Sequence, residues 1–326
     1  MLVKEKEAKY YITRLTSGRC ICSSRDLVDL IDCFNKPAFP AAIQPCYDEK
    51  VFLPAIERLK EIGILVPGNT TEETEVLAEW QNRIQDLVQL TPADNTSPFI
   101  IYGGNDDQEH ADCFIKATAP LIKELACRLF PFKRKIYTVL LSGNNYEKTA
   151  DEYHIPRRTT AFVDSKSVLV LNTHQLTERI NKTEPYARSI KHELIHVLLG
   201  QRHYYIPAWI EEGICELYSG QKYFPMAEEL IKKRKKTYRF TEAEPLITNS
   251  IMDIDDSPVT RNTVYVQAYS FVKYLVETVG EKTFWTVIEN TGICLNFREV
   301  FLKITKQDIS DLENAWAASL DEAGTQ

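Results

Sequence analysis

Five consecutive residues, His192-Glu193-Leu194-Ile195-His196, constrain the fold and chemistry of this chain more than any other stretch. The apolar residues around them indicate a buried amphipathic helix over Arg188 to Gly200, with the glycine just past its end. Residues four apart share one face of a helix, so the two histidines can hold a zinc ion through ring nitrogens at about 2.0–2.1 Å. Glu193 lies about 100° further round the helix, where it can take a proton from a metal-bound water. The alternative is a pair of unrelated histidines beside a core helix.

A second helix, expected over Ala208 to Tyr218, offers a third ligand for the same ion. Catalytic zinc usually combines three protein ligands with one open position for water. Glu212 is the candidate ligand, and Gly213 beside it is expected to let this helix approach the histidine helix closely. The side chain of Glu211, the neighbouring residue, is expected to point away from the ion. Glu216, one turn beyond Glu212, is either a partner that orients a histidine or a surface carboxylate.

The pattern His-Glu-Leu-Ile-His, followed by Pro-Ala-Trp-Ile-Glu-Glu-Gly, resembles the gluzincin zinc metallopeptidases, in particular the peptidase MA-like group. The resemblance extends over roughly residues 96–320 and is strongest at the two helices. It implies one Zn²⁺ ion, bound by His192, His196 and Glu212. It also implies that Glu193 is the general base and then the general acid in the hydrolysis of a peptide bond.

The same family often supplies a tyrosine from a later helix to stabilise the oxyanion of the tetrahedral intermediate. Here apolar residues recur at helical spacing from Asn262 to Val279. The resemblance implies Tyr265 as the first candidate for this role and Tyr269 as the second. For either residue the alternative is an aromatic side chain of the core. Aminopeptidases of this clan hold a free amine with a Gly-x-Met-Glu-Asn stretch, which this sequence lacks, and that favours cleavage within a chain.

We expect an α+β fold with more than one domain, because the chain is long enough for two. Residues 96–326 should form a mainly helical, zincin-type metallopeptidase domain with a small mixed sheet, and residues 69–95 a linker and a helix. Residues 1–68 show two short strands, two helices and a closing strand, the pattern of a small winged-helix-like domain. That pattern resembles the domains that recognise leader peptides in clusters making modified peptides, which implies a leader peptide as a partner. The alternative is a structural domain without a ligand.

The expected sheet includes a hairpin directly before the histidine helix. Its arms run from Thr160 to Asp164 and from Ser167 to Asn172, with the turn at Ser165-Lys166. The second arm is either an ordinary core strand or an exposed edge that pairs with an extended peptide substrate.

Composition limits the expected partners. The chain has 326 residues, of which 44% are hydrophobic and 26% charged, as in ordinary globular proteins. Its net charge of -7 argues against a nucleic-acid partner, and the basic run Lys232 to Lys236 is better explained as a solvated helix end. No apolar run reaches the roughly 18 residues that a membrane span needs, and the charged N-terminus lacks the apolar core of a signal peptide. We therefore expect a cytoplasmic protein with no membrane partner.

The eight cysteines fit the same compartment. Cys113, Cys127 and Cys215 are embedded in apolar sequence, which predicts buried free thiols. A second metal site is the alternative for the four cysteines nearest the N-terminus, but their spacing matches no common zinc knuckle.

These expectations combine into one function and two alternatives. The expected function is zinc-dependent hydrolysis of bonds within a peptide or protein substrate, for example a specific leader peptide. The first alternative is a zinc-bound protein with weak or no catalysis that binds or regulates peptides through residues 1–68. The second is a metallohydrolase that acts on small esters or amides.

Overall fold

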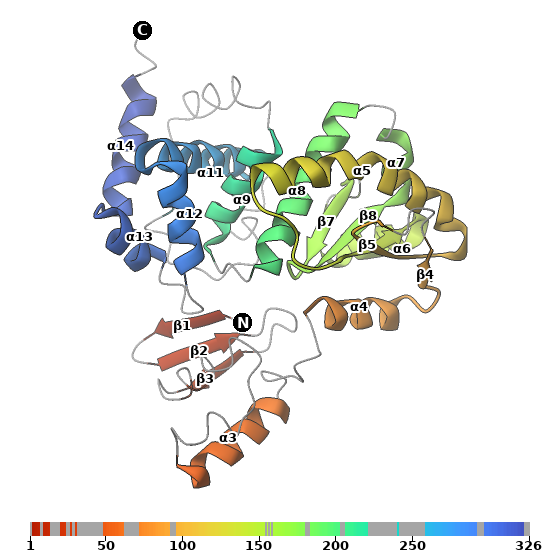
Figure 1. The fold of residues 1–326 in the computed structure, drawn as a ribbon, viewed down its shortest axis with the longest axis horizontal. Coiled ribbons are helices and arrows are strands. Elements are labelled where there is room, and N and C mark those ends of the chain that lie inside the picture. The colour runs from red at the N-terminus through yellow and green to blue at the C-terminus, as the bar shows by residue number, and fades with distance from the viewer. Residues whose placement is uncertain are drawn as a thin grey trace.

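Helices surround one mixed β-sheet, an α+β arrangement that confirms the expected class (Figure 1). The computed structural model describes residues 2–6, 9–13, 20–23, 27, 30, 48–61, 72–91, 96–153, 155, 157, 159–179, 183–202, 206–220, 240, 258–291 and 297–322. Figure 1 shows the sheet on one side of the molecule and a bundle of C-terminal helices on the other.

The sheet has five strands in the order β4-β5-β6-β8-β7. Their bounds are β4 Val88–Leu90, β5 Phe99–Gly103, β6 Ile136–Leu141, β7 Ala161–Asp164 and β8 Val168–Asn172. Strands β5, β6 and β8 run parallel, and the edge strands β4 and β7 each pair antiparallel with their neighbour. Every residue of β8 is buried, as expected for a strand whose two faces are both covered. Of the two alternatives for the second arm of the hairpin, the core strand is therefore correct, and the first arm, β7, is the edge.

The hairpin itself is confirmed. Strands β7 and β8 pair antiparallel with Asp164 opposite Val168, and the amide of Ser167 donates a hydrogen bond of 2.9 Å to the carbonyl of Asp164. Ser165 and Lys166 have φ values of 50° and 57°. Tight hairpin turns need such left-handed residues, because the turn must follow the twist of the two strands.

Helices cover both faces of the sheet, and the side chains of β8 alternate between them. Leu169 and Leu171 belong to the apolar core under α5 and α8. Val168 and Val170 belong to the core under α4 and α6, with Trp80 as its largest member. The helices of this half of the chain are α4 Glu72–Arg83, α5 Gln108–Arg128, α6 Gly143–Glu152, α7 Thr173–Arg179 and α8 Thr183–Gln201.

Residues 69–95, the expected linker and helix, supply α4 and β4 to the same structural unit as the sheet. The indole Nε1 of Trp80 in α4 donates a hydrogen bond of 2.9 Å to the Asp164 carboxylate at the end of β7. Strand β4 extends the sheet beyond β5. Helix α4 and strand β4 therefore both contact the sheet.

A helical bundle forms the C-terminal half. It contains α9 Ala208–Ser219, α11 Pro258–Val279, α12 Glu281–Asn290, α13 Phe297–Thr305 and α14 Ile309–Glu322. Helix α9 packs against both α8 and α11. A Cβ added at Gly213 would lie 2.5 Å from Cγ2 of Val272 and 2.6 Å from the carbonyl oxygen of Ala268, both in α11. Gly213 was expected to let α9 approach the histidine helix. That prediction was wrong, because the glycine lies against α11.

Near the N-terminus, three strands form an antiparallel sheet in the order β1-β2-β3. The two expected strands are β2 and β3, and β1 is an additional one. The bounds are β1 Leu2–Lys6, β2 Lys9–Thr13 and β3 Cys20–Ser23, followed by helix α3 Glu49–Glu61. Most of the expected first helix, the expected closing strand at residues 64–66 and the basic run from Lys232 to Lys236 lie outside the described residues.

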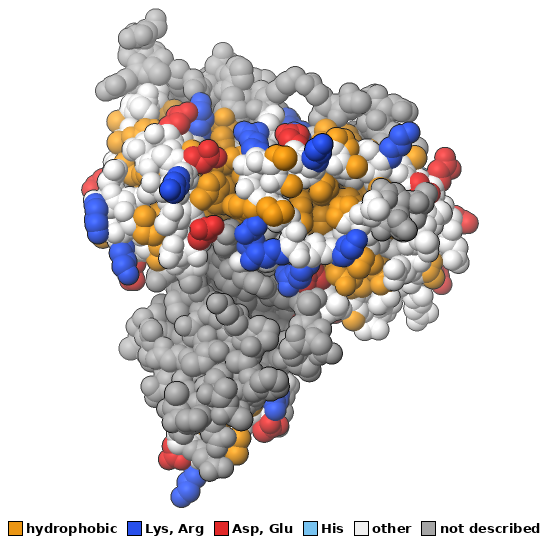
Figure 2. All heavy atoms as spheres, in the orientation of Figure 1, with side chains coloured by type: hydrophobic (Ala, Val, Ile, Leu, Met, Phe, Trp, Pro, Cys, Tyr) orange, Lys and Arg blue, Asp and Glu red, His pale blue; other side chains and the backbone are white. Residues whose placement is uncertain are grey.

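Within the described ranges, no helix is both long enough and apolar enough to cross a membrane. On the face drawn in Figure 2, acidic and basic side chains are interspersed over the described surface, and apolar side chains gather between them.

Candidate active site

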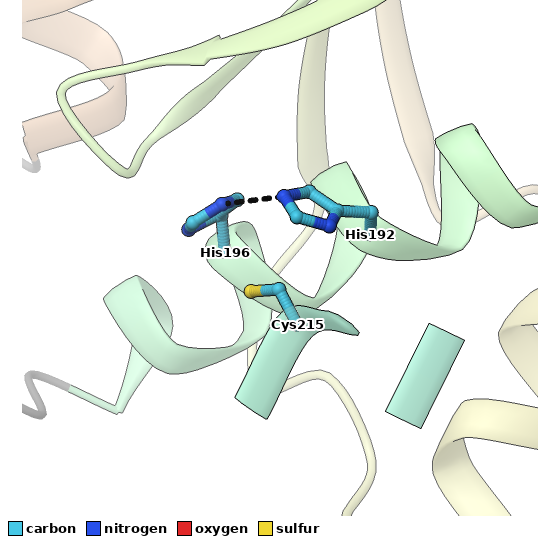
Figure 3. Close-up of side chains that lie close together, drawn as sticks. All are labelled: His192, His196 and Cys215. Carbon is cyan, nitrogen blue, oxygen red and sulfur yellow. Dashed lines mark hydrogen bonds between the residues drawn. The ribbon is translucent and has the colours of Figure 1, made fainter. Parts of the chain in front are cut away.

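Helix α8 carries the two histidines on a side that faces α9 (Figure 3). Leu194 and Ile195, between the histidines, are fully buried in the core. The helix extends from Thr183 to Gln201, so Gly200 lies in its last turn and not, as expected, just past its end. A Cβ at Gly200 would lie 2.1 Å from the carbonyl oxygen of Lys166, so the glycine allows the β7–β8 turn to lie directly against α8.

Three candidate ligand atoms from the two helices form a small triangle. Nε2 of His192 lies 3.2 Å from Nε2 of His196. Oε2 of Glu212 lies 3.1 Å from Nε2 of His192 and 3.5 Å from Nε2 of His196. Ligands at 2.0–2.1 Å from one ion with tetrahedral angles would be about 3.3 Å apart. The three side chains therefore fit three of the four positions around a single tetrahedral ion.

Carboxylates also contact the other nitrogen of each imidazole. Nδ1 of His196 lies 2.8 Å from Oε1 of Glu211, and Nδ1 of His192 lies 3.2 Å from Oε1 of Glu216. Such partners fix the tautomer and orientation of a ligating histidine. The expectation that Glu211 points elsewhere is wrong. Of the two alternatives for Glu216, the structure shows the one in which its carboxylate contacts a histidine.

The electrostatics of this cluster suit a cation. Burial alone would lower the pKa of each imidazole, but its neighbours outweigh burial, so both pKa values lie well above the usual one. For His192 these neighbours are chiefly Glu212 and Glu216, and for His196 they are chiefly Cys215 and Glu212. Burial would raise the pKa of Glu212, yet the two imidazoles hold it well below its usual range. The pKa of Glu211 is also lowered, chiefly by the charge of Lys166 and the contact with His196, which outweigh burial.

Glu193 behaves differently from the other carboxylates of the cluster. Burial raises its pKa, and the charges of Glu212 and Glu216 add to that effect, against the opposing influence of the two histidines. A carboxyl whose pKa is raised toward neutrality is well suited to accept a proton and return it. Glu193 is thus a carboxyl with a raised pKa that lies within electrostatic range of both histidines.

Two tyrosines outside α8 and α9 are close enough for the site's charges to affect them. Burial raises the pKa of Tyr265 in α11 well above its usual value, and the charges of Glu212 and Glu193 raise it further. Burial and the charge of Glu193 raise the pKa of Tyr146 in α6 to about 12, and its hydroxyl donates a hydrogen bond of 2.8 Å to the carbonyl of Thr159. Tyr269, one turn along α11 from Tyr265, is buried. The structure therefore brings Tyr265 to the site, and it adds Tyr146, which the sequence did not indicate.

Cys215 is a further candidate donor that the sequence did not indicate. It is a free, buried thiol, and a ligand atom from each of His192, His196 and Cys215 lies within 4.8 Å of the others (Figure 3). Sulfur and nitrogen ligands of one zinc ion would be about 3.5 Å apart. A separation of up to 4.8 Å therefore does not by itself show that the thiol is at ligand distance. The Glu212 oxygen shows ligand spacing to both histidines, so Glu212 and Cys215 are both candidates for the third ligand, and Glu212 is the one that the sequence motif predicts.

The other described cysteines correct an expectation. Cys113 and Cys127, both in α5, are free but exposed, although their apolar surroundings in the sequence predicted burial. They lie on the outer side of a helix whose opposite side faces the sheet. Apolar neighbours along the chain did not identify the buried side of this helix.

The chain matches no protein-family model and no curated protein sequence. The resemblance to gluzincin peptidases therefore depends on the motifs in α8 and α9.

Proposed function

We propose that this protein is a zinc metallopeptidase that hydrolyses bonds within a peptide chain, and that its zincin-type domain comprises the sheet and the C-terminal helices. The observation that carries the proposal is the ligand triangle of His192, His196 and Glu212, with edges of 3.1, 3.2 and 3.5 Å, beside the half-buried Glu193. One Zn²⁺ ion is the proposed cofactor. The proposed location is the cytoplasm.

When bound, the ion supplies Lewis-acid activation of a water molecule and of the substrate carbonyl. Glu193 accepts a proton from the attacking water while the water oxygen bonds to the carbonyl carbon. The hydroxyl of Tyr265, kept protonated by its raised pKa, donates a hydrogen bond to the developing oxyanion. Glu193 then delivers its proton to the leaving nitrogen as the C–N bond breaks, and a free carboxylate and a free amine result.

The sheet offers a place for an extended substrate. Strand β7 is an edge strand, and the turn that follows it packs against α8 at Gly200. An exposed edge strand can pair with a substrate backbone, which binds a segment in the middle of a chain as readily as one at its end. This supports cleavage within a chain. Recognition of a leader peptide by a winged-helix-like unit in residues 1–68 is a further part of the proposal, based on the sequence pattern alone.

The test is to measure bound zinc and digestion of a peptide library for the wild type and for Glu193→Gln. The variant should keep stoichiometric zinc, because Glu193 is not a proposed ligand, and its turnover should fall by about 10²–10⁴-fold. Wild-type zinc binding with no hydrolysis of any peptide would instead support the peptide-binding or regulatory alternative. Hydrolysis of small esters or amides alone would support the non-protease alternative. A variant as active as the wild type would rule out Glu193 as the base.

A further inference from the structure

We infer that Lys166, in the turn between β7 and β8, is a positioning residue that sets how tightly the metal site holds its ion. This inference rests on the proposed metal site, and it concerns a residue from a separate part of the fold. Its ammonium group pairs with Oε2 of Glu211, and Oε1 of the same carboxylate lies 2.8 Å from Nδ1 of His196. Glu211 thus has one oxygen on the lysine and the other on a proposed ligand.

The pairing of Lys166 with Glu211 matters because the Glu211 carboxylate is buried. Glu211 is only 4% exposed, and the side chain of Lys166 is 27% exposed. A buried carboxylate that loses one of its partners has a strong tendency to find water, because an unpaired charge in the interior is unfavourable. A turn of the carboxylate toward water would separate Oε1 from His196. Lys166 therefore holds Glu211 in the orientation that fixes the ring of His196.

The backbone at Lys166 provides a second observation. Its φ of 57° is a left-handed value that glycine and asparagine adopt much more readily than lysine. The carbonyl of the same residue lies so close to α8 that residue 200 has no room for a Cβ. A disfavoured residue type persists where the surrounding structure holds it, often at a functional site. Here the turn is locked onto α8 one helical turn beyond His196, and its lysine reaches across to α9.

Two effects of removing Lys166 would act in opposite directions. Loss of a positive charge near the ion would by itself strengthen cation binding. Loss of the orientation of Glu211 would weaken it, since partners of ligating histidines typically change metal affinity by about 10- to 100-fold. Lys166 and His196 contact different oxygens of Glu211, and this carboxylate offsets the charge of Lys166. We therefore expect the loss of orientation to dominate, and zinc affinity to fall.

The experiment measures the zinc affinity of the full chain by competition with a chromophoric chelator. Lys166→Asn suits the left-handed backbone but is too short to reach Glu211, and it should weaken zinc binding by about 10-fold. Lys166→Met should weaken it equally while losing more thermal stability, because methionine keeps the backbone strain. Lys166→Arg should restore most of the affinity. The matched control is Lys191→Met, which removes another α8-linked ion pair, at 2.9 Å from Glu124, and should leave zinc affinity unchanged.

A double substitution tests whether Lys166 acts through Glu211. In a Glu211→Gln background, Lys166→Asn should have little further effect on zinc affinity, because the two residues form one network. Unchanged or tighter zinc binding in Lys166→Asn would overturn the inference, as would zinc affinities that simply follow melting temperature across the variants. If the wild type itself bound no zinc, the proposed function would fail first, and the two failures are thereby distinguished.

Discussion

Glu212 and Cys215 lie about one turn apart on α9, and both approach the two imidazoles. Glu212 shows the spacing of a tetrahedral ligand to both rings, and it is the ligand that the sequence motif predicts. Glu212→Gln should therefore lose stoichiometric zinc after dialysis, because a neutral amide is a poor ligand and two histidines alone do not complete a catalytic zinc site. Cys215→Ser should keep it. Metal analysis of the two purified variants beside the wild type measures this difference.

The reverse result would reassign the third ligand to the thiol. Cobalt substitution gives an independent reading, since a thiolate bound to cobalt absorbs strongly in the near ultraviolet. That band should be weak or absent in the wild type. A strong band that disappears in Cys215→Ser would contradict the assignment of Glu212.

Tyr265 and Tyr269 form a second matched pair, one turn apart on α11. Of the two, Tyr265 is the residue whose pKa is raised by the charges of Glu212 and Glu193, in addition to burial. Tyr265→Phe should lower kcat by about 100-fold with little change in KM, because a hydrogen bond to the oxyanion is made only in the transition state. Tyr269→Phe should leave kcat within a few-fold of the wild type. Equal losses in both variants would remove Tyr265 from the proposed mechanism.

The residues that could be predicted from the sequence are those fixed by helical spacing within one helix. His192, Glu193 and His196 needed only the helical period, and Glu212 needed the resemblance as well. Glu211 could not be placed, because adjacent residues on a helix differ by about 100° and one of them was expected to face away. The two imidazoles lie one turn apart along α8, so they meet a wide face of α9. That face includes both i, i+4 pairs, 211 with 215 and 212 with 216.

At the scale of elements, the fit of α9 against α11 depends on Gly213. An alanine there would place its Cβ 2.5 Å from Val272 and 2.6 Å from a backbone oxygen. Gly213→Ala should destabilise the protein by about 1–3 kcal/mol in denaturant unfolding, because overpacking outweighs the roughly 1 kcal/mol that alanine contributes to a helix. It should also weaken zinc binding, since Glu212 is the adjacent residue.

Gly104→Ala is the matched control for this prediction. The nearest atom to an added Cβ there is the Asp107 carboxylate oxygen at 3.4 Å, an ordinary contact, so stability should change by less than about 0.5 kcal/mol. If Gly213→Ala were as stable as Gly104→Ala, the close approach of α9 to α11 would be wrong.

The sequence predicted whether a segment forms a helix or a strand better than it predicted which segments lie beside it. The β7–β8 hairpin and the two site helices follow from local patterns, because turn residues and apolar periodicity act over a few residues. The order of strands in the sheet is decided by contacts between distant segments. The apolar sequence of β8 is compatible with a core strand or an edge strand. Only its pairing with β6, a distant segment, distinguishes the two. The partner of Gly213 was missed for the same reason, since α11 begins more than forty residues further along the chain.

At the scale of the whole molecule, the site lies between two halves, one packed on the sheet and the other on the helical bundle. His192 and His196 belong to α8, which packs on the sheet, whereas Glu212 belongs to α9, which packs on the helical bundle through α11. An ion that bonds to both helices must stabilise their contact, because those bonds are lost when the chain unfolds. Contacts between the histidines and the carboxylates of α9 link the ligand atoms across this boundary.

Removing the metal should therefore lower the melting temperature of the full chain. A ligand at 100 times its dissociation constant stabilises the folded state by about 2.7 kcal/mol, which corresponds to a shift of several degrees for a protein of this size. Scanning calorimetry with and without a chelator should show that shift in the wild type and in Glu193→Gln, which keeps all three ligands. His196→Ala should melt at the chelated wild-type temperature or below, and should not respond to chelator. A wild type that loses its zinc with no change in melting temperature would mean that the ion does not connect the two halves, and the ligand set drawn from both helices would have to be abandoned.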